Sequence, residues 1–192
     1  KAVSLWDRAS KLGSAEATYC YAMCKLKGNG TTQDVLIAKD LLTEMSDKNP
    51  YAPADLALAK LLRQGNESIG LKPDPVLAFS HLVYAADRGL VTAQFHVANC
   101  YWVGDGVEKS ETTAMFWYKA AADGGYAAAR FVLGTLYYNG LAGTHEEKDH
   151  KSIGWEHYCQ AADGGDPRAM FNVGLEYMLE SSDLVERDLD LA

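Results

Sequence analysis

Residues 115–125 read MFWYKAAADGG, and this stretch decides the fold because it recurs along the chain. Residues 79–89 (FSHLVYAADRG) and 155–165 (WEHYCQAADGG) align with it without a gap, and the final glycines of the three segments lie 36 and 40 residues apart. The same frame fits residues 5–13 and, more weakly, residues 41–49. Self-similarity at this period is typical of proteins built from short stacked repeats.

A second pattern follows each of these segments. Residues 17–22, 93–98, 129–134 and 169–174 read ATYCYA, AQFHVA, ARFVLG and AMFNVG, and residues 54–59 fit if Pro50 is one extra residue in the turn. In both patterns apolar residues recur at spacings of three and four, which is a helical period. Each unit is therefore predicted to consist of a helix A, which carries the second pattern, and a helix B, which carries the first.

Small side chains have fixed places in this frame. The chain holds 17 Gly and 27 Ala among its 192 residues. Glycines follow the predicted helices as stop signals, among them Gly28, Gly104 and Gly140. The other small residues form two columns where helices are expected to approach closely: Ala22, Ala59, Ala98, Gly134 and Gly174 on helix A, and Ala2, Ala38, Ala78, Ala114 and Gly154 on helix B.

The pattern Ala-x-Phe-x-Leu-Gly-x-x-Tyr-x-x-Gly, followed by Trp-Tyr-x-Lys-Ala-Ala-x-x-Gly, resembles the Sel-1-like repeat family, which is related to the tetratricopeptide repeats. Gly104-Asp-Gly-Val107 matches the Gly-x-Gly-Val turn of that family, and residues 49–74 depart from its pattern. The resemblance implies an all-α, right-handed α/α solenoid. It also implies an adaptor, as in endoplasmic-reticulum degradation, the activation of fungal chitin synthesis and bacterial signalling.

One repeat array is predicted over residues 1–192. Its units are 1–13 (partial), 14–49, 50–89, 90–125, 126–165 and 166–192 (partial). Neither end shows the polar cap that repeat arrays need for solubility. The chain is therefore expected to be a piece of a longer protein with further repeats or domains, or to pair through its open ends in a homo-oligomer.

The distribution of charged residues excludes some classes of partner. The net charge of −8 argues against a nucleic-acid binder, which needs a basic face. Residues 97–192 hold 7 Lys and Arg against 16 Asp and Glu, so a charged partner of this half is expected to be basic. The longest stretch without charge, residues 89–104, contains His96 and Asn99, so no direct membrane insertion is expected.

Cysteines and sequons indicate different compartments. Cys20, Cys24, Cys100 and Cys159 have no repeating spacing, which favours reduced thiols and the cytoplasm. Two Asn-x-Ser/Thr sequons, at Asn29 and Asn66, are candidate N-glycosylation sites and leave the endoplasmic-reticulum lumen as the alternative.

No catalytic residue, cofactor or metal ion is predicted. The run from His145 to His150 lacks the His-Glu-x-x-His spacing of a zinc site and is interpreted as a solvated insertion. The sequence has no Walker loop and no Gly-x-Ser-x-Gly motif. The enzymatic alternative is a hydrolase that uses His96 with a carboxylate.

Binding is the favoured function. In the family that the chain resembles, helix A lines the concave surface, and the positions free for a partner lie one, four and seven residues after the aromatic residue. The predicted binding residues are His96, Asn99, Trp102, Thr135, Tyr138, Asn172, Leu175 and Met178. The alternative is that the column Leu26, Arg63, Trp102, Tyr138 and Met178 packs against the next helix A as core. The chain is thus predicted to be a non-catalytic scaffold for a protein or peptide, or else a docking module of a larger enzyme.

Overall fold

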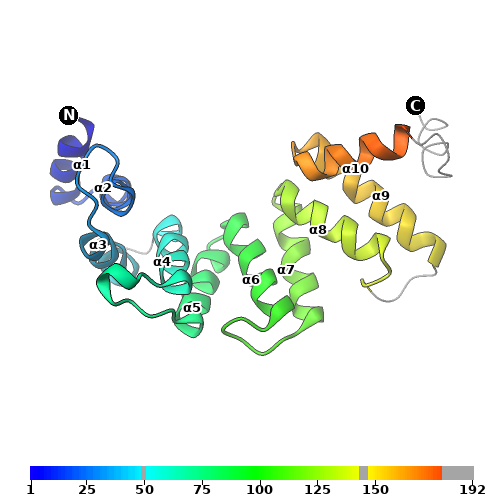
Figure 1. The fold of residues 1–192 in the computed structure, drawn as a ribbon, viewed down its shortest axis with the longest axis horizontal. Helices are drawn as coiled ribbons and strands as arrows, with labels where there is room; N and C mark the ends of the chain where they lie inside the picture. The colour runs from blue at the N-terminus through cyan, green and yellow to red at the C-terminus, as the bar shows by residue number, and fades with distance from the viewer. Residues whose placement is uncertain (49–50, 143–146, 179–192) are drawn as a thin grey trace. The chain divides into compact units, whose positions relative to one another are not determined.

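The structure, a computed structural model, describes residues 1–48, 51–142 and 147–178. These residues form ten α-helices and one short 3-10 helix (Figure 1). They divide into two compact units, residues 1–110 and residues 111–192. The prediction of an all-α fold of alternating A and B helices is confirmed.

Unit 1 contains three helices of each type. The A helices are α2 (Ala15–Lys27), α4 (Ala52–Gln64) and α6 (Val91–Val103); the B helices are α1 (Ala2–Lys11), α3 (Val35–Lys48) and α5 (Pro75–Asp87). Unit 2 contains the A helices α8 (Ala127–Tyr138) and α10 (Pro167–Met178) and the B helices α7 (Glu111–Asp123) and α9 (Glu147–Asp163). Within each unit, every helix packs against the next one along the chain.

Local sequence sets the ends of these helices. Asp74 caps α5, because its Oδ1 atom accepts a hydrogen bond from the Leu77 backbone N–H at 2.9 Å, and Pro75 occupies the first turn. Gly28 and Gly104 end α2 and α6 in the left-handed conformation, with φ of 73° and 80°. The predicted glycine stops are confirmed at these positions.

The segment that departs from the repeat pattern forms a longer connection. After α4 the chain makes the 3-10 helix Glu67–Ile69 and an isolated antiparallel bridge between Asn66 and Leu71. Gly65 has φ of 67°, and a Cβ atom there would lie 2.8 Å from the Leu71 carbonyl oxygen. The irregularity is thus confined to the turn, and α4 still packs against α5.

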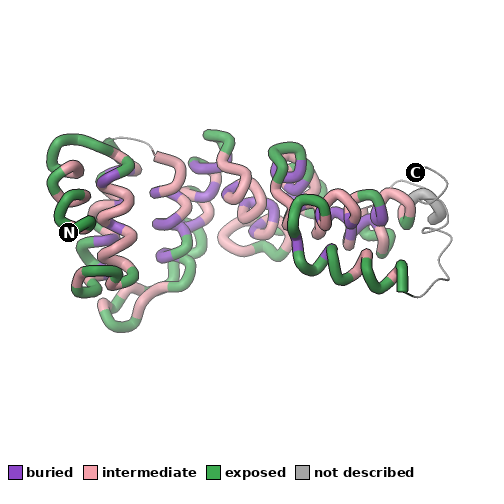
Figure 2. Tube along the Cα trace, turned by 90° about the horizontal axis from the view of Figure 1, so that it is seen from above, coloured by how far each residue is buried: buried purple, intermediate pink, exposed green. Residues whose placement is uncertain are grey.

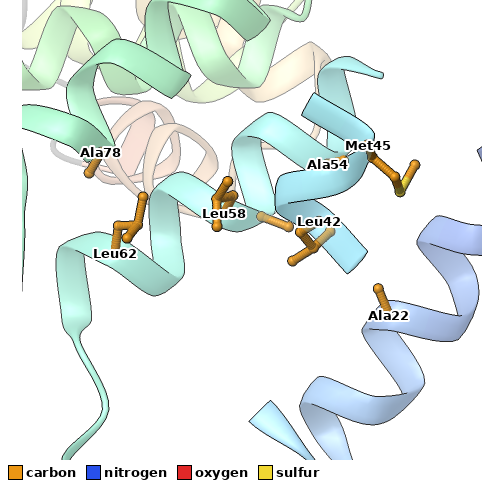
Figure 3. Close-up of a cluster of buried hydrophobic side chains, with 8 residues drawn as sticks. Ala22, Leu42, Met45, Ala54, Leu58, Leu62 and Ala78 are labelled. Carbon is orange, nitrogen blue, oxygen red and sulfur yellow. The ribbon is translucent and has the colours of Figure 1, made fainter. Parts of the chain in front are cut away.

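The core of unit 1 lies where α2, α3, α4 and α5 meet (Figure 3). Leu42 and Leu58 are the most deeply buried of its large side chains, with exposures of 0% and 2%. Around them lie Ala22, Met45, Ala54, Ala57, Leu62 and Ala78. Removing this apolar surface from water is the main stabilising term, at about 25 cal/mol per Å².

Most of the small-residue columns are buried, as predicted. In unit 1 their exposures run from 0% to 2% at Ala22, Ala38, Ala59, Ala78 and Ala98. Gly134 is buried in unit 2, and a Cβ atom there would lie 2.8 Å from the Tyr158 ring. The columns do not extend to the first and last described helices, because Ala2 and Gly174 are exposed and a Cβ atom at Gly174 would meet nothing within 4 Å. Figure 2 shows the buried positions along the helices of each unit.

Candidate partner-binding face

A groove in unit 1 runs along the A helices α2 and α4. It has a volume of about 490 Å³, and we call it the α2/α4 groove. The residues that line it are Tyr19, Met23, Leu26, Lys27, Gln33, Val35, Pro53, Leu56, Ala57, Lys60, Leu61, Gln64, Gly65, Asn66 and Leu90. The side chains that the two helices contribute are mostly apolar, so the groove can take an apolar side chain of a partner.

The charge of the α2/α4 groove has one sign. Its lining includes Lys27 and Lys60, both exposed, and no Asp or Glu from residues 1–48, 51–142 or 147–178. The side-chain amide of Gln33 donates a hydrogen bond to the Leu26 carbonyl oxygen at 3.0 Å. An apolar surface with lysines beside it favours ligands that combine apolar groups with carboxylates.

The predicted residues of unit 1 lie on the next A helix, α6. His96, Asn99 and Trp102 are all half-buried. The His96 ring meets the Phe95 ring edge to face at 5.8 Å between centroids. None of the three is part of the α2/α4 groove. Their role in binding a partner stays a prediction.

The surroundings of His96 are cationic. Burial, together with the positive charges of Lys60 and Arg63, lowers the pKa of His96 to about 4. Arg63 pairs through Nε with the Oδ2 atom of Asp105 at 2.6 Å. The imidazole is therefore neutral at physiological pH and is a weaker base than an ordinary histidine, which is unfavourable for the hydrolase alternative.

A smaller pocket in unit 2 lies among α8, α9 and α10. It has a volume of about 170 Å³, and we call it the α8/α10 pocket. It is lined by Tyr138, Trp155, Tyr158, Asn172, Leu175 and Glu176. The Tyr138 hydroxyl donates a hydrogen bond to Glu176 Oε1 at 3.1 Å, and the Tyr158 hydroxyl bonds to Thr135 Oγ1, also at 3.1 Å. Burial raises the pKa of Tyr138, and the Glu176 carboxylate raises it further.

The structure therefore brings together four of the five residues predicted in unit 2. Tyr138, Asn172 and Leu175 line the α8/α10 pocket, and Thr135 supports its wall through Tyr158. Met178 lies outside it with an exposure of 82%. The column Leu26, Arg63, Trp102, Tyr138 and Met178 is thus half-buried at Leu26, Trp102 and Tyr138 and exposed at Arg63 and Met178.

Three residues of the α8/α10 pocket were not among the predicted ones: Trp155, Tyr158 and Glu176. The two aromatic residues belong to helix B, to which the sequence frame gave no role in binding. Glu176 could have been singled out from the sequence alone. It falls in a column that otherwise reads Cys24, Leu61, Cys100 and Leu136, so it is a carboxylate at an apolar position of the repeat.

A buried polar cluster in unit 1 was also missed. Asp55, 1% exposed, accepts a hydrogen bond from Ser46 Oγ at 2.6 Å, and its Oδ1 atom lies 3.1 Å from His81 Nδ1. Serine and histidine thus share one carboxylate oxygen, whereas in a catalytic triad the histidine stands between the other two. The cluster joins α3, α4 and α5, which is a structural role.

Both sequons lie in connections between helices. Asn29 is exposed in the turn after α2. Asn66 is half-buried and lines the α2/α4 groove, and its Oδ1 atom accepts a hydrogen bond from the Ser68 backbone N–H at 3.1 Å. Glycosylation at either site stays a prediction. A glycan on Asn66 would stand at the groove itself.

Residues 1–48, 51–142 and 147–178 contain neither a candidate membrane span nor a candidate metal site. No helix there combines the length and the apolar character needed to cross a membrane. In the same residues no three His, Cys, Asp or Glu side chains are grouped so that they could hold a metal ion. His145, the first residue of the interpreted insertion, lies outside the described residues.

Comparison with known families gives the class of protein. The model of the Sel1 repeat family matches residues 15–50, 52–90, 91–126, 127–166 and 167–192. The chain therefore belongs to the Sel1 repeat family, and its helices A and B are the two helices of that repeat.

Two curated relatives are fungal regulators. The chain is 28% identical over 193 aligned residues to "Chitin synthase regulator SKT5" of Saccharomyces cerevisiae, with 98% of this chain and 27% of that protein aligned. It is 27% identical over 184 residues to "Chitin synthase regulatory factor 3" of Schizosaccharomyces pombe, with 94% of this chain and 19% of that protein aligned. The chain thus spans about a quarter or less of the length of either relative.

Solved structures agree on the fold. A Sel1 repeat protein from Oxalobacter formigenes superposes with a TM-score of 0.79 at 22% identity, over 91% of this chain and 68% of that one. A protective antigen of uropathogenic Escherichia coli with an SLR fold superposes with a TM-score of 0.78 at 23% identity, over 91% of this chain and 36% of that one. At this identity the likeness shows the solenoid fold alone.

Proposed function

We propose that this chain is the protein-binding part of a regulatory adaptor and that it holds its partner on the face formed by its A helices. Membership of the Sel1 repeat family supports the adaptor class. The names of the two fungal relatives support a regulatory role and make a chitin synthase the first partner to test.

One observation carries the proposal. The α2/α4 groove and the α8/α10 pocket, in different units, use equivalent positions of the repeat. The equivalent pairs are Leu26 and Tyr138, Ala57 and Asn172, Lys60 and Leu175, and Leu61 and Glu176. Recesses that recur at one place in a repeat are what a solenoid uses to bind an extended partner.

The composition of the α2/α4 groove indicates what it binds. We expect a peptide segment in which a large apolar side chain stands beside an aspartate or glutamate. Met23 and Leu56 offer the apolar surface, and Lys27 and Lys60 offer the positive charge. A glycan on Asn66 would obstruct this segment, so the proposal favours the unglycosylated chain.

Site-specific photo-crosslinking tests the proposal. A benzophenone amino acid replaces Met23 in the α2/α4 groove or Trp102 on α6, and the labelled chain is irradiated with the chitin synthase of the same organism. The matched controls replace Leu36 on α3 and Tyr84 on α5, which are B-helix residues with exposures of 52% and 58%.

The expected result is a crosslinked synthase from both A-helix positions and none from the B-helix positions. Equal yields from the two sets would contradict binding on the A-helix face. A crosslink to a different protein from the A-helix positions would retain the binding face and replace the synthase as partner.

The second candidate function is a docking module within a larger protein. It is favoured by the fact that the chain corresponds to 27% and 19% of the two curated relatives. Both candidates use the same A-helix face. They differ in whether the partner belongs to another chain, and crosslinking in the full-length protein separates them.

A further inference from the structure

Three aromatic side chains and one carboxylate converge on the α8/α10 pocket. Tyr138 comes from α8, Trp155 and Tyr158 come from α9, and Glu176 comes from α10. The Tyr138 and Tyr158 rings lie 5.9 Å apart at 47°. Among the described residues, no Lys or Arg lines the pocket. Aromatic faces beside a carboxylate are the surroundings that bind an organic cation.

Glu176 is the informative residue, because the repeat does not require it. At the equivalent positions Leu61, Cys100 and Leu136 are buried, with exposures of 7%, 2% and 6%. Packing selects an apolar side chain at these three positions. Glu176 lies on the last described helix, where the position is only half-buried, and its carboxylate lines the α8/α10 pocket.

The hydrogen bonding of Glu176 leaves room for a cation. The Tyr138 hydroxyl donates to Oε1 and fixes the carboxylate against the aromatic wall. Among the described residues, Oε2 has no hydrogen-bond partner. An ammonium or guanidinium group in the pocket could donate to Oε2 while it lies against the tyrosine rings.

The same unit already contains a guanidinium in this kind of environment. Arg168 lies 4.2 Å above the centroid of the Phe131 ring, and its Nη2 donates to the buried carboxylate of Asp166 at 2.7 Å. Phe131 and Tyr158 are neighbours, with centroids 5.6 Å apart. An aromatic ring and a carboxylate therefore hold Arg168 of this chain. The neighbouring α8/α10 pocket presents the same two kinds of group to an arginine or lysine of a partner.

We propose that the α8/α10 pocket receives a basic side chain, arginine or lysine, of the protein partner. The inference rests on the proposed function, since it names what one part of the binding face recognises. The cation would lie against the tyrosine rings at the mouth of the pocket with its charge paired to Glu176, and Asn172 would offer its side-chain amide to the adjoining peptide.

The test uses short peptides of the form Gly-Ser-Gly-X-Gly-Ser-Gly, in which X is arginine, lysine or the neutral norleucine. The readout is the NMR signal of the Trp155 indole N–H in chain labelled with nitrogen-15. We expect saturable shifts with arginine and lysine and none with norleucine. Glu176→Gln should weaken the binding of the basic peptides about tenfold, because a charge-assisted contact is lost.

Two variants serve as controls. Glu156→Gln removes an exposed carboxylate from α9 outside the pocket and should leave binding unchanged. Tyr138→Phe keeps the ring and removes the hydroxyl that orients Glu176, so it should weaken binding less than Glu176→Gln. Melting curves of all variants show whether the fold is retained.

Several outcomes would overturn the inference. If the norleucine peptide bound as tightly as the arginine peptide, the pocket would recognise apolar groups and not cations. If Glu176→Gln bound the basic peptides with unchanged affinity, the carboxylate would have no role in binding. Self-association that is lost in Glu176→Gln would make a second copy of the chain the occupant of the pocket. If Glu176→Gln still gives the synthase crosslink from Trp102, the proposed function stands without this inference.

Discussion

The α2/α4 groove and the α8/α10 pocket are built on the same framework and differ in charge. Where the first has Leu26, Lys60 and Leu61, the second has Tyr138, Leu175 and Glu176. Within the part of the chain that the structure describes, the first is lined by two lysines and no carboxylate, and the second by one carboxylate and no lysine or arginine. The repeat thus fixes where a recess forms, and the residues at its variable positions decide what enters it.

A second difference explains how the α8/α10 pocket becomes aromatic. Unit 1 has Ala59 and Leu82 at the positions where unit 2 has Gly134 and Tyr158. A Cβ atom on Gly134 would lie 2.8 Å from Tyr158 Cδ1. In unit 2 the missing side chain of Gly134 leaves room for the Tyr158 ring, and that ring forms a wall of the pocket.

The largest expected effect concerns the support of the α2/α4 groove. Asp55→Ala leaves Ser46 and His81 without their shared carboxylate in the interior, which should cost about 3 kcal/mol in the free energy of unfolding. Urea denaturation of unit 1, followed by circular dichroism, measures this. Asp47→Ala, an exposed carboxylate on the same helix as Ser46, should change stability by less than about 0.5 kcal/mol. If the free energy of unfolding fell equally in both variants, the cluster would have no structural role.

The next prediction concerns the glycines of unit 2. Gly134→Val should cost about 1 to 3 kcal/mol, because the added methyl groups meet Tyr158 and the Gly154 carbonyl oxygen. The peptide binding of the α8/α10 pocket should weaken as Tyr158 is displaced. Gly174→Val in the same column is the control, since a Cβ atom there meets nothing within 4 Å. Equal stability of the two valine variants would contradict a close approach of α8 and α9 at Gly134.

The smallest expected effect is the pH dependence of stability that arises from His96 in unit 1. The unfolded chain protonates His96 near the ordinary value of 6.5, whereas the folded chain resists protonation until its pKa of about 4. The unfolded state then binds more protons, so stability falls as the pH falls from about 6.5 toward 4. The loss between pH 7 and pH 5 should be about 2 kcal/mol.

Unfolding curves of the chain and of His96→Gln at pH 7 and pH 5 check this prediction. The variant should lose less stability on acidification than the original chain. An identical pH dependence in the two proteins would mean that His96 protonates as readily in the folded chain as in the unfolded one.

Periodicity and glycine placement were sufficient to predict the fold. Residues 115–125 and their copies set the period, and the glycines after α2 and α6 take the left-handed conformation that the stop signal requires. The frame also selected Tyr138, Asn172 and Leu175, which the structure brings together in the α8/α10 pocket. All three are variable positions on one face of helix A.

The remainder of the site depends on contacts between helices. Trp155 and Tyr158 reach the pocket from a B helix, and a pattern read along one helix gives no indication of which neighbour a ring will meet. The Ser46, Asp55 and His81 cluster joins residues 9, 26 and 35 positions apart, with no motif among them. Glu176 was visible as a break in an apolar column, and only its bond to Tyr138 gives that break a chemical meaning.

The most direct test of the central claim measures the affinity of the chitin synthase for two variants of the chain. Each variant, Lys60→Glu or Glu176→Lys, reverses one charge on the A-helix face. Each should weaken binding at least about tenfold while the melting temperature changes little, because opposite charges on the partner are recognised at the two recesses. Lys72→Glu and Glu156→Lys reverse exposed charges outside both recesses and should leave the affinity unchanged. Unchanged affinity in both recess variants, or equal losses in the outside ones, would contradict the claim that the A-helix recesses bind the partner.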